Sequence, residues 1–171
     1  MGKYNFELMT KYNKDVNKQL NEIIQTLSEE QWDKQFPSFW KSIHELCSHI
    51  FAADYRWLNR FKLIVNSQIL TDIYFNKAYG FEELFFKSIN EYITKRIEMD
   101  NIIIDFVKDL TENDLDKILK YPNPKGILFE NRIDVCLMHL FNHQTHHRGM
   151  ISLYLEMLGK ENDFSNLYLN E

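Results

Sequence analysis

Cysteine is scarce in this sequence. Among 171 residues only Cys47 and Cys136 are cysteines, and they form no Cys-x-x-Cys motif. Two cysteines are too few for a disulfide framework, so a reduced interior is the simpler interpretation. We expect both side chains to pack as small hydrophobic groups, with Cys136 a weaker candidate for a redox or metal-binding role.

An excess of positive charge is also missing. The chain has 20 Lys and Arg residues against 25 Asp and Glu residues, a formal net charge of -5 and a pI near 5.7. Surfaces that bind nucleic acids use clustered basic residues to displace counterions from phosphates, and no basic tract is present here. We therefore expect no nucleic-acid partner.

Long apolar runs are absent as well. A membrane-spanning helix needs a run of about 18 or more apolar residues, and the chain contains none. The first residues, Met1 to Asn5, lead into a polar helical pattern with no apolar segment behind a basic start, so we expect no signal peptide. These absences favour a cytoplasmic protein without a membrane partner.

The composition is otherwise that of a globular protein. Hydrophobic residues make up 44% of the chain, charged residues 26% and aromatic residues 15%, which provides many large side chains to bury. A chain of this length fits one domain with a full core. We therefore expect residues 1–171 to form a single domain.

Apolar residues recur every three or four positions along four segments, which indicates amphipathic helices. These segments cover about residues 6–27, 43–65, 81–110 and 131–158, with a loop containing one short helical turn at 66–80. Two similar phrases, Leu27–Trp32 and Leu110–Leu115, each follow a long segment and suggest a weak two-fold repeat. The turn residues at 122–126 predict a small hairpin or extended loop before the last helix. The fold class expected is an all-α four-helix bundle.

The densest chemical signal lies in the last helix, where four of the six histidines fall within nine residues: His139, His143, His146 and His147. Histidine is the commonest metal ligand and titrates near neutral pH. Residues four apart lie on one helical face, about 5–6 Å apart at Cβ, so two such imidazoles can share one ion. The stripe that contains His143 and His147 otherwise carries core residue types, so we expect this pair to face the interior.

Two imidazoles leave a metal ion short of ligands, and His49 is the best candidate for the third. It is the only other histidine on a mostly apolar helical face, whereas His44 lies about 140° around the same helix and is expected at the surface. Three histidines from two helices, with water completing the shell, are typical of a catalytic metal site. The alternative is that His143 and His147 are core histidines bonded to the backbone.

Two segments carry a family resemblance. They are Ser42–Ile50, which reads SIHELCSHI and is followed by Asp54 and Trp57, and His139–Ile151, which reads HLFNHQTHHRGMI. With these segments the sequence resembles the DinB family of damage-inducible, metal-binding proteins over nearly its whole length. The His-His-Arg-Gly phrase is the more specific part of the pattern.

The resemblance implies an up-up-down-down four-helix bundle, commonly a homodimer, with one divalent metal ion held by three histidines. By position these ligands are His49, His143 and His147. Some members of the wider superfamily are similar to S-transferases that use a low-molecular-weight thiol. The family usually has Gln where this chain has Met150, so a contact between this position and a substrate is in doubt.

The function expected from these features is that of a metal-dependent enzyme acting on a small electrophilic molecule, either as a thiol S-transferase or as a hydrolase. The alternative is a non-catalytic structural metalloprotein, or a dimeric binding module in a stress response. A metal sensor or carrier is disfavoured because no flexible His-rich or Cys-rich tract is present. Zn²⁺ fits three imidazoles best, although Ni²⁺, Fe²⁺ or Mn²⁺ could occupy the same ligands.

Several polar residues near the predicted ligands could assist them. Metal-binding histidines usually donate their second N–H group to a carboxylate or carbonyl, and Asp54, Asn142 and Gln144 are candidates for that role. Arg148, beside the predicted site, could hold an anionic substrate, although such an arginine is more often solvated or salt-bridged.

Overall fold

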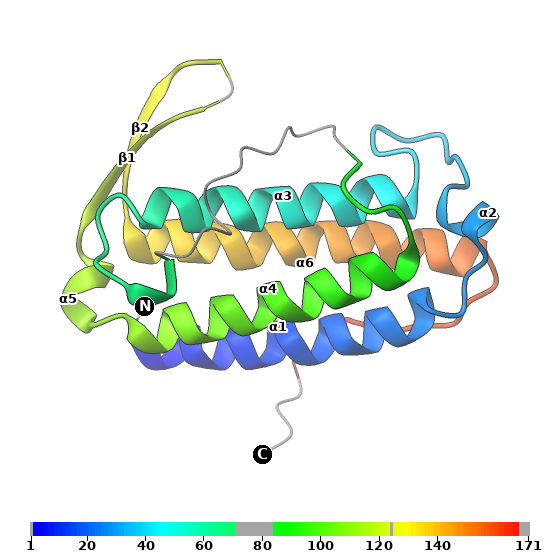
Figure 1. Ribbon diagram of the computed structural model, residues 1–171, viewed down its shortest axis with the longest axis horizontal. Coiled ribbons are helices and arrows are strands. Elements are labelled where there is room, and N and C mark those ends of the chain that lie inside the picture. Colours follow the sequence, from blue (N-terminus) through cyan, green and yellow to red (C-terminus); the bar gives the residue numbers. More distant parts are fainter. Residues whose placement is uncertain (1, 71–83, 124, 168–171) are drawn as a thin grey trace.

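The computed structural model describes residues 2–70, 84–123 and 125–167. Within these ranges the chain forms four long helices that lie side by side (Figure 1): α1 (Lys3–Ile24), α3 (Ile43–Phe61), α4 (Ile89–Asp109) and α6 (Ile133–Met157). Short helices α2 (Glu29–Trp32) and α5 (Glu112–Leu115) and a 3₁₀ turn (Gln68–Leu70) lie in the connections. The predicted all-α four-helix bundle is confirmed.

The direction of each helix follows from contacts between distant residues. The Lys3 ammonium group donates to the Lys108 carbonyl and Asn17 donates to Asp100, so α1 and α4 run antiparallel. The ring of Phe61 stacks on that of Phe106 and Asp54 pairs with Arg96, so α3 and α4 run parallel. Figure 1 shows α6 returning in the direction of α1. The order along the chain is therefore up-down-down-up rather than up-up-down-down, because the connection that carries α2 reverses the chain between α1 and α3.

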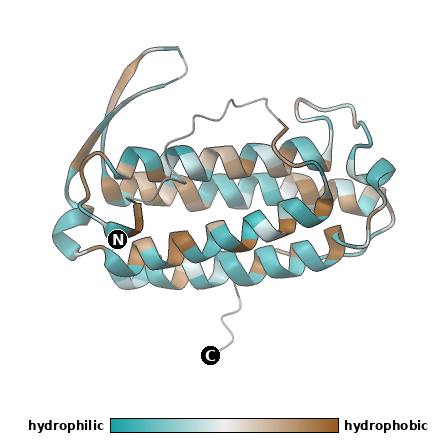
Figure 2. Cartoon of the chain, viewed as in Figure 1, coloured by the Kyte–Doolittle hydropathy of each residue, from teal (hydrophilic) through white to brown (hydrophobic). Residues whose placement is uncertain are grey.

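Each long helix buries one apolar face against the others. Figure 2 shows hydrophobic and hydrophilic residues alternating along the helices, as the three-four spacing requires. Leu20, Leu46, Met99 and Leu155 are among the core side chains, each at most 1% exposed. None of the helices in the described ranges combines the length and the apolar character that a membrane span needs.

The two similar phrases adopt the same local structure. Ser28 and Gln31 form a capping box at the start of α2, and Thr111 and Asp114 form one at the start of α5. In such a box each side chain accepts a hydrogen bond from the other residue's backbone, which stabilises a helix start. The predicted likeness of these phrases therefore has a physical basis in shared capping.

The third long helix begins later than predicted. The sequence pattern places its start at residue 81, but α4 begins at Ile89, where the Ser88 side chain caps it by accepting from the Glu91 backbone N–H. Leu84 to Lys87 are not helical, and residues 71–83 lie outside the described part of the chain. The predicted short turn within 66–80 is the 3₁₀ turn that ends at Leu70.

The predicted hairpin precedes the last helix. Strands β1 (Ile118–Pro122) and β2 (Leu128–Arg132) pair antiparallel, with Tyr121 opposite Phe129. Gly126 has a φ of 78°, a conformation that glycine adopts at low cost. The Tyr121 ring packs against the Trp57 ring of α3, 5.1 Å away between centroids, so the hairpin covers one end of the space between α3 and α6.

Candidate metal centre

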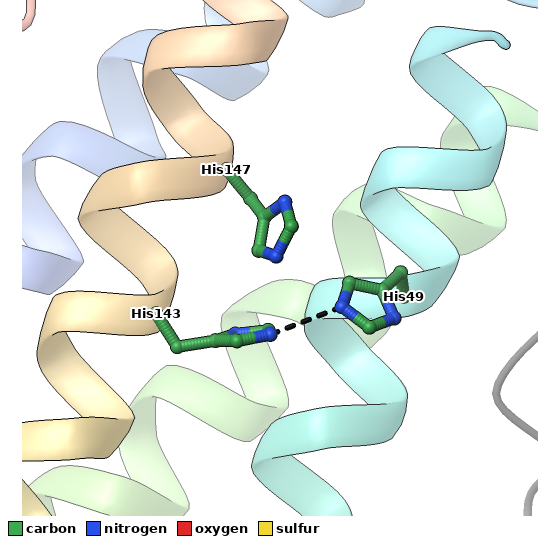
Figure 3. Close-up of side chains that lie close together, drawn as sticks. All are labelled: His49, His143 and His147. Carbon is green, nitrogen blue, oxygen red and sulfur yellow. Dashed lines mark hydrogen bonds between the residues drawn. The ribbon is translucent and has the colours of Figure 1, made fainter. Parts of the chain in front are cut away.

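Three histidine side chains meet between α3 and α6. His49 projects from the middle of α3, and His143 and His147 project from successive turns of α6 (Figure 3). The Nε2 atoms of His49 and His143 are 3.0 Å apart, and one potential ligand atom from each of the three rings lies within 4.8 Å of the others. The structure thus brings together the three residues that the sequence predicts as ligands.

The pairing follows from helix geometry. His143 and His147 are one turn apart on α6, so their rings lie on the same face and meet edge to face, with centroids 4.3 Å apart. The antiparallel α3 then presents His49 to both, with centroid distances of 4.9 Å to His143 and 4.6 Å to His147. His49 and His147 are buried, and His143 is partly exposed.

Two of the rings, those of His143 and His147, are held in the form that binds metals. Burial, together with the neighbouring His49, His139 and His146, lowers the pKa of His143 to about 3. Burial, together with His143 and His146, likewise lowers the pKa of His147 to about 3. Neutral imidazole carries the nitrogen lone pair that coordinates a cation.

The donor set fits a divalent ion. Zinc–imidazole bonds of about 2.0–2.1 Å in tetrahedral geometry place ligand nitrogens roughly 3.3 Å apart. The ring nitrogens in this structure lie at similar spacings, and small side-chain movements would bring them to that distance. The buried Nδ1 atoms of His143 and His147 have no hydrogen-bond partner among the described residues. Buried polar atoms are costly when they are left unsatisfied, and an ordered water would relieve that cost. An ion would bind on the opposite side of the rings, where the Nε2 atoms of His49 and His143 face one another. No described carboxylate or thiol joins the three rings as a fourth ligand.

Comparison with known proteins identifies the family. The family model described as "DinB family" matches residues 1–170. The chain belongs to the DinB family.

Individual relatives agree with this assignment. "Protein DinB" of Bacillus subtilis (strain 168) is 26% identical over 159 residues, which cover 93% of this chain and 88% of that protein. Among solved structures, a DinB-like protein from Bacillus cereus ATCC 10987 has a TM-score of 0.61 at 18% identity, covering 86% of this chain and 87% of that chain. The structural likeness supports the bundle fold of this family member.

A tryptophan in the connection before α3 also contacts the centre in this DinB-family chain. The Trp40 ring stacks on the His49 ring at 4.0 Å and meets the His147 ring edge-on at 6.3 Å. The Trp40 carbonyl accepts a hydrogen bond from the Tyr154 hydroxyl, which ties the connection to α6. Helical periodicity does not point to Trp40, because a residue outside a periodic helix carries no spacing signal.

Two of the three polar residues proposed to assist the ligands, Asp54 and Gln144, belong to a buried network with Arg96. Gln144 donates to the Asp54 carboxylate, and Asp54 pairs with Arg96 at 2.6 Å. Arg96 also pairs with Asp100 at 2.8 Å. Burial raises the pKa of Asp54 to about 6, and the Arg96 guanidinium opposes that rise. This network joins three helices behind the centre, and Asn142 is exposed.

Arg148 also belongs to this interior rather than to the metal centre. It is 3% exposed and donates to Asn13 of α1 and to Gln144. The expected place of Arg148 beside the three histidines is therefore not seen, because α6 directs this side chain toward α1.

The other histidines are not among the three converging rings. His139 and His146 are exposed and lie beside them as neighbours, 6.1 Å from His143 and 4.8 Å from His147 between centroids. The expectation for His44 is wrong: it is 7% exposed, its Nδ1 lies 2.8 Å from Asp33, and its ring stacks on Trp32. The chain that carries α2 folds back over the start of α3, which the helical pattern of α3 does not reveal.

The two cysteines are poor nucleophiles in this structure. Both are free and buried. Burial raises the pKa of the Cys47 thiol to about 12 and that of the Cys136 thiol to about 11. Both side chains therefore remain thiols near neutral pH, in keeping with the predicted packing role.

A pocket reaches the centre from the side of the hairpin. Its volume is about 510 Å³, and it lies between α3, α6 and the two strands. His143 is the member of the histidine cluster that lines it, together with the aromatic rings of Trp57, Tyr121 and Phe129. Met150 does not line this pocket, so nothing in the structure brings that position into contact with a molecule bound there.

Proposed function

We propose that this DinB-family protein binds one divalent metal ion through His49, His143 and His147 and is a metal-dependent enzyme that acts on a small electrophilic molecule. The observation that carries the proposal is the convergence of three imidazoles from two helices, one of which, His143, lines a pocket. Zn²⁺ is the ion favoured by this donor set, and Ni²⁺, Fe²⁺ and Mn²⁺ are the alternatives.

Three histidine ligands suit a catalytic metal site better than a site whose ligands neutralise the charge of the ion. Three imidazoles contribute no negative charge, so the ion would keep its full charge and lower the pKa of a bound water or thiol. The residues around it supply binding and shielding: Trp57 and Tyr121 form apolar walls beside His143. We favour thiol S-transfer, with hydrolysis as the alternative reaction.

The nucleophile of an S-transfer would come from outside the chain. Cys136 lines the pocket, but burial raises the pKa of its thiol to about 11, and Cys47 is fully buried. A low-molecular-weight thiol cosubstrate is therefore part of the proposal. Its sulfur would lose a proton and form a bond to an electrophilic carbon, whose leaving group departs.

Elemental analysis of purified protein tests the metal centre. We expect about one metal ion per chain in the wild type and a large loss of metal in the His49→Ala variant. Asn142→Ala is the matched control, because Asn142 is exposed on the same helix as two of the ligands. An unchanged metal content in His49→Ala would refute the three-histidine site.

A second candidate function is a structural metalloprotein. It is favoured by the burial of His49 and His147, since an ion held there would brace α3 against α6. The two functions differ in what metal removal does. A brace predicts a large fall in melting temperature with chelator, whereas an enzyme predicts loss of metal-dependent thiol consumption with a test electrophile such as 1-chloro-2,4-dinitrobenzene while the fold persists.

Assembly and location complete the proposal. A homodimer is supported by large apolar side chains that α6 leaves exposed, including Met138, Leu153 and Met157, each about half exposed. Light scattering during size-exclusion chromatography measures the assembly directly. The two free thiols, Cys47 and Cys136, support a reducing compartment such as the cytoplasm. The match of one family model to residues 1–170 supports a single domain.

A further inference from the structure

The pocket beside the metal centre has an unusual charge. Two arginines line it, Arg56 and Arg60, one turn apart on α3. No Asp or Glu is among the described residues that line it, although the chain as a whole has a net charge of -5. Burial lowers the pKa of Arg56, and the adjacent positive charge of Arg60 lowers it further. Two positive charges held close together in a half-closed pocket favour the binding of an anion.

Arg60 is held in a fixed position by the hairpin. Its guanidinium carbon lies 4.7 Å from the centroid of the Trp57 ring and 4.4 Å from that of the Tyr121 ring. One of its nitrogens donates to the Pro122 carbonyl of β1 at 3.0 Å. Among the described residues its hydrogen-bond partner is thus a neutral carbonyl. A guanidinium has five N–H donors in a planar fork that matches a carboxylate, and stacking on rings leaves its edges available.

The two arginines and His49 lie along one stripe of α3. His49, Ala53, Arg56 and Arg60 are spaced by four, three and four residues, so they lie on one face. At 1.5 Å per residue the step from His49 to Arg60 is about 16 Å along the axis. Ala53, which lines the pocket, occupies little of the space between them. His49 itself does not line the pocket, whose histidine side is formed by His139 and His143.

The walls of the pocket between these ends are aromatic. Trp57, Tyr121 and Phe129 line it, and Tyr121 and Phe129 stack with centroids 6.0 Å apart. Flat rings favour a flat, apolar ligand body through burial of its faces. A volume of about 510 Å³ is within the usual range for pockets that enclose small molecules.

We propose that this pocket binds a small organic carboxylate, whose flat apolar body packs on the three aromatic rings and whose carboxylate is held by Arg60. Arg56 adds positive charge, and the other end of the ligand faces His143. This inference rests on the proposed function, because the reaction at the His143 end of the ligand is the metal-dependent reaction proposed above. The carboxylate can belong to the electrophilic substrate or to the thiol cosubstrate.

Calorimetric titration of metal-free protein, prepared with EDTA, tests the carboxylate site independently of the metal. The probes are cinnamate and its neutral analogue cinnamamide. A bidentate contact between charged groups predicts that cinnamate binds roughly tenfold to a hundredfold more tightly. Arg60→Gln is expected to remove this preference, and Arg60→Lys to restore part of it, because lysine keeps the charge but loses the fork.

Two control variants separate charge from shape. Lys120→Gln removes one positive charge from the same hairpin, where Lys120 pairs with Glu130 at the surface and does not line the pocket, so the preference should persist. Ala53→Phe fills the pocket without changing charge, so it should weaken both probes alike. Melting curves confirm that each variant is folded. Equal affinity for the two probes, no detectable binding of cinnamate, or a preference that survives in Arg60→Gln would overturn the proposal.

A second pair of probes assigns the carboxylate to its source. If the thiol carries it, 3-mercaptopropionate will bind more tightly than 2-mercaptoethanol and will lose this advantage in Arg60→Gln. If the electrophile carries it, cinnamate alone will show the Arg60-dependent preference. Metal content, measured in the same preparations before EDTA treatment, should be equal in wild type and Arg60→Gln. A wild type without metal would contradict the proposed function, while the carboxylate site would still be decided by the probes.

Discussion

Replacing Arg96 by Met should destabilise the protein more than any surface charge change. Arg96 is 1% exposed and pairs with Asp54 at 2.6 Å and with Asp100 at 2.8 Å. Met fills a similar volume but leaves two buried carboxylates without their cation. Removing one partner of a buried ion pair costs about 3–5 kcal/mol, a large part of the 5–15 kcal/mol that is typical of a whole domain.

The assay is thermal unfolding followed by circular dichroism. For a chain of this size each kcal/mol shifts the melting temperature by roughly 2–4 °C, so the expected fall is roughly 6–20 °C. Lys95→Met is the matched control, since Lys95 precedes Arg96 on α4 and pairs with Glu98 in a largely exposed setting. Such a surface pair contributes at most about 1 kcal/mol.

The pH dependence of Arg96→Met identifies the cause. Without the guanidinium, burial is left to raise the pKa of Asp54 and Asp100 in the folded state above their unfolded values. At a pH between the unfolded-state and folded-state pKa values of these carboxyl groups, the folded state binds more protons than the unfolded state. The free energy of unfolding therefore falls as pH rises through that range. The deficit relative to wild type should be smaller at pH 5 than at pH 8. A deficit that is independent of pH, or below about 1 kcal/mol, would refute the reasoning.

Three further predictions concern the centre and the caps. The pKa values of His143 and His147 fall to about 3 on folding, so the unfolded state binds more protons below about pH 6.5. The metal-free protein should therefore lose stability as pH falls from 6.5 toward 3, by up to about 1.4 kcal/mol per pH unit for each histidine. A free energy of unfolding that stays constant between pH 6 and 4 in chemical denaturation would contradict this. Trp40→Ala removes the ring stacked on His49. By analogy with other groups that orient metal ligands, this change should weaken Zn²⁺ binding roughly tenfold in a chelator competition. Unchanged affinity would show that the stacked ring does not orient the ligand. Ser28→Ala breaks the capping box of α2 and should cost about 1 kcal/mol in urea unfolding, while an effect below about 0.3 kcal/mol would assign the cap no role.

Sequence periodicity predicted the elements of the bundle well. The three-four spacing of apolar residues located all four long helices, and the turn residues located the hairpin. The spacing of apolar residues placed the start of α4 too early. The apolar residues before Ser88 resemble a helix face, but the Ser88 cap determines where the helix begins. A cap acts through one hydrogen bond, which hydrophobic patterning does not register.

The histidine cluster shows where local reasoning succeeds. His143 and His147 are one turn apart, so their common face is a property of α6 alone. His49 could be selected because it lies on an apolar helical face that must turn inward. His44 was misplaced for the converse reason. Its burial comes from the α2 connection, where Asp33 and Trp32 contact it.

The sequence by itself therefore determined the helices, the family, and the three residues whose imidazoles converge, because each depends on spacing along one helix or on a local motif. Only the tertiary structure decided which neighbour each face meets. It directs Arg148 toward α1, places Trp40 against His49, and brings the hairpin over Arg60. Each of these contacts joins segments that are far apart in the sequence and that the connections between helices bring together. Helical periodicity specifies which residues share a face, but it does not specify which helix or strand packs against that face.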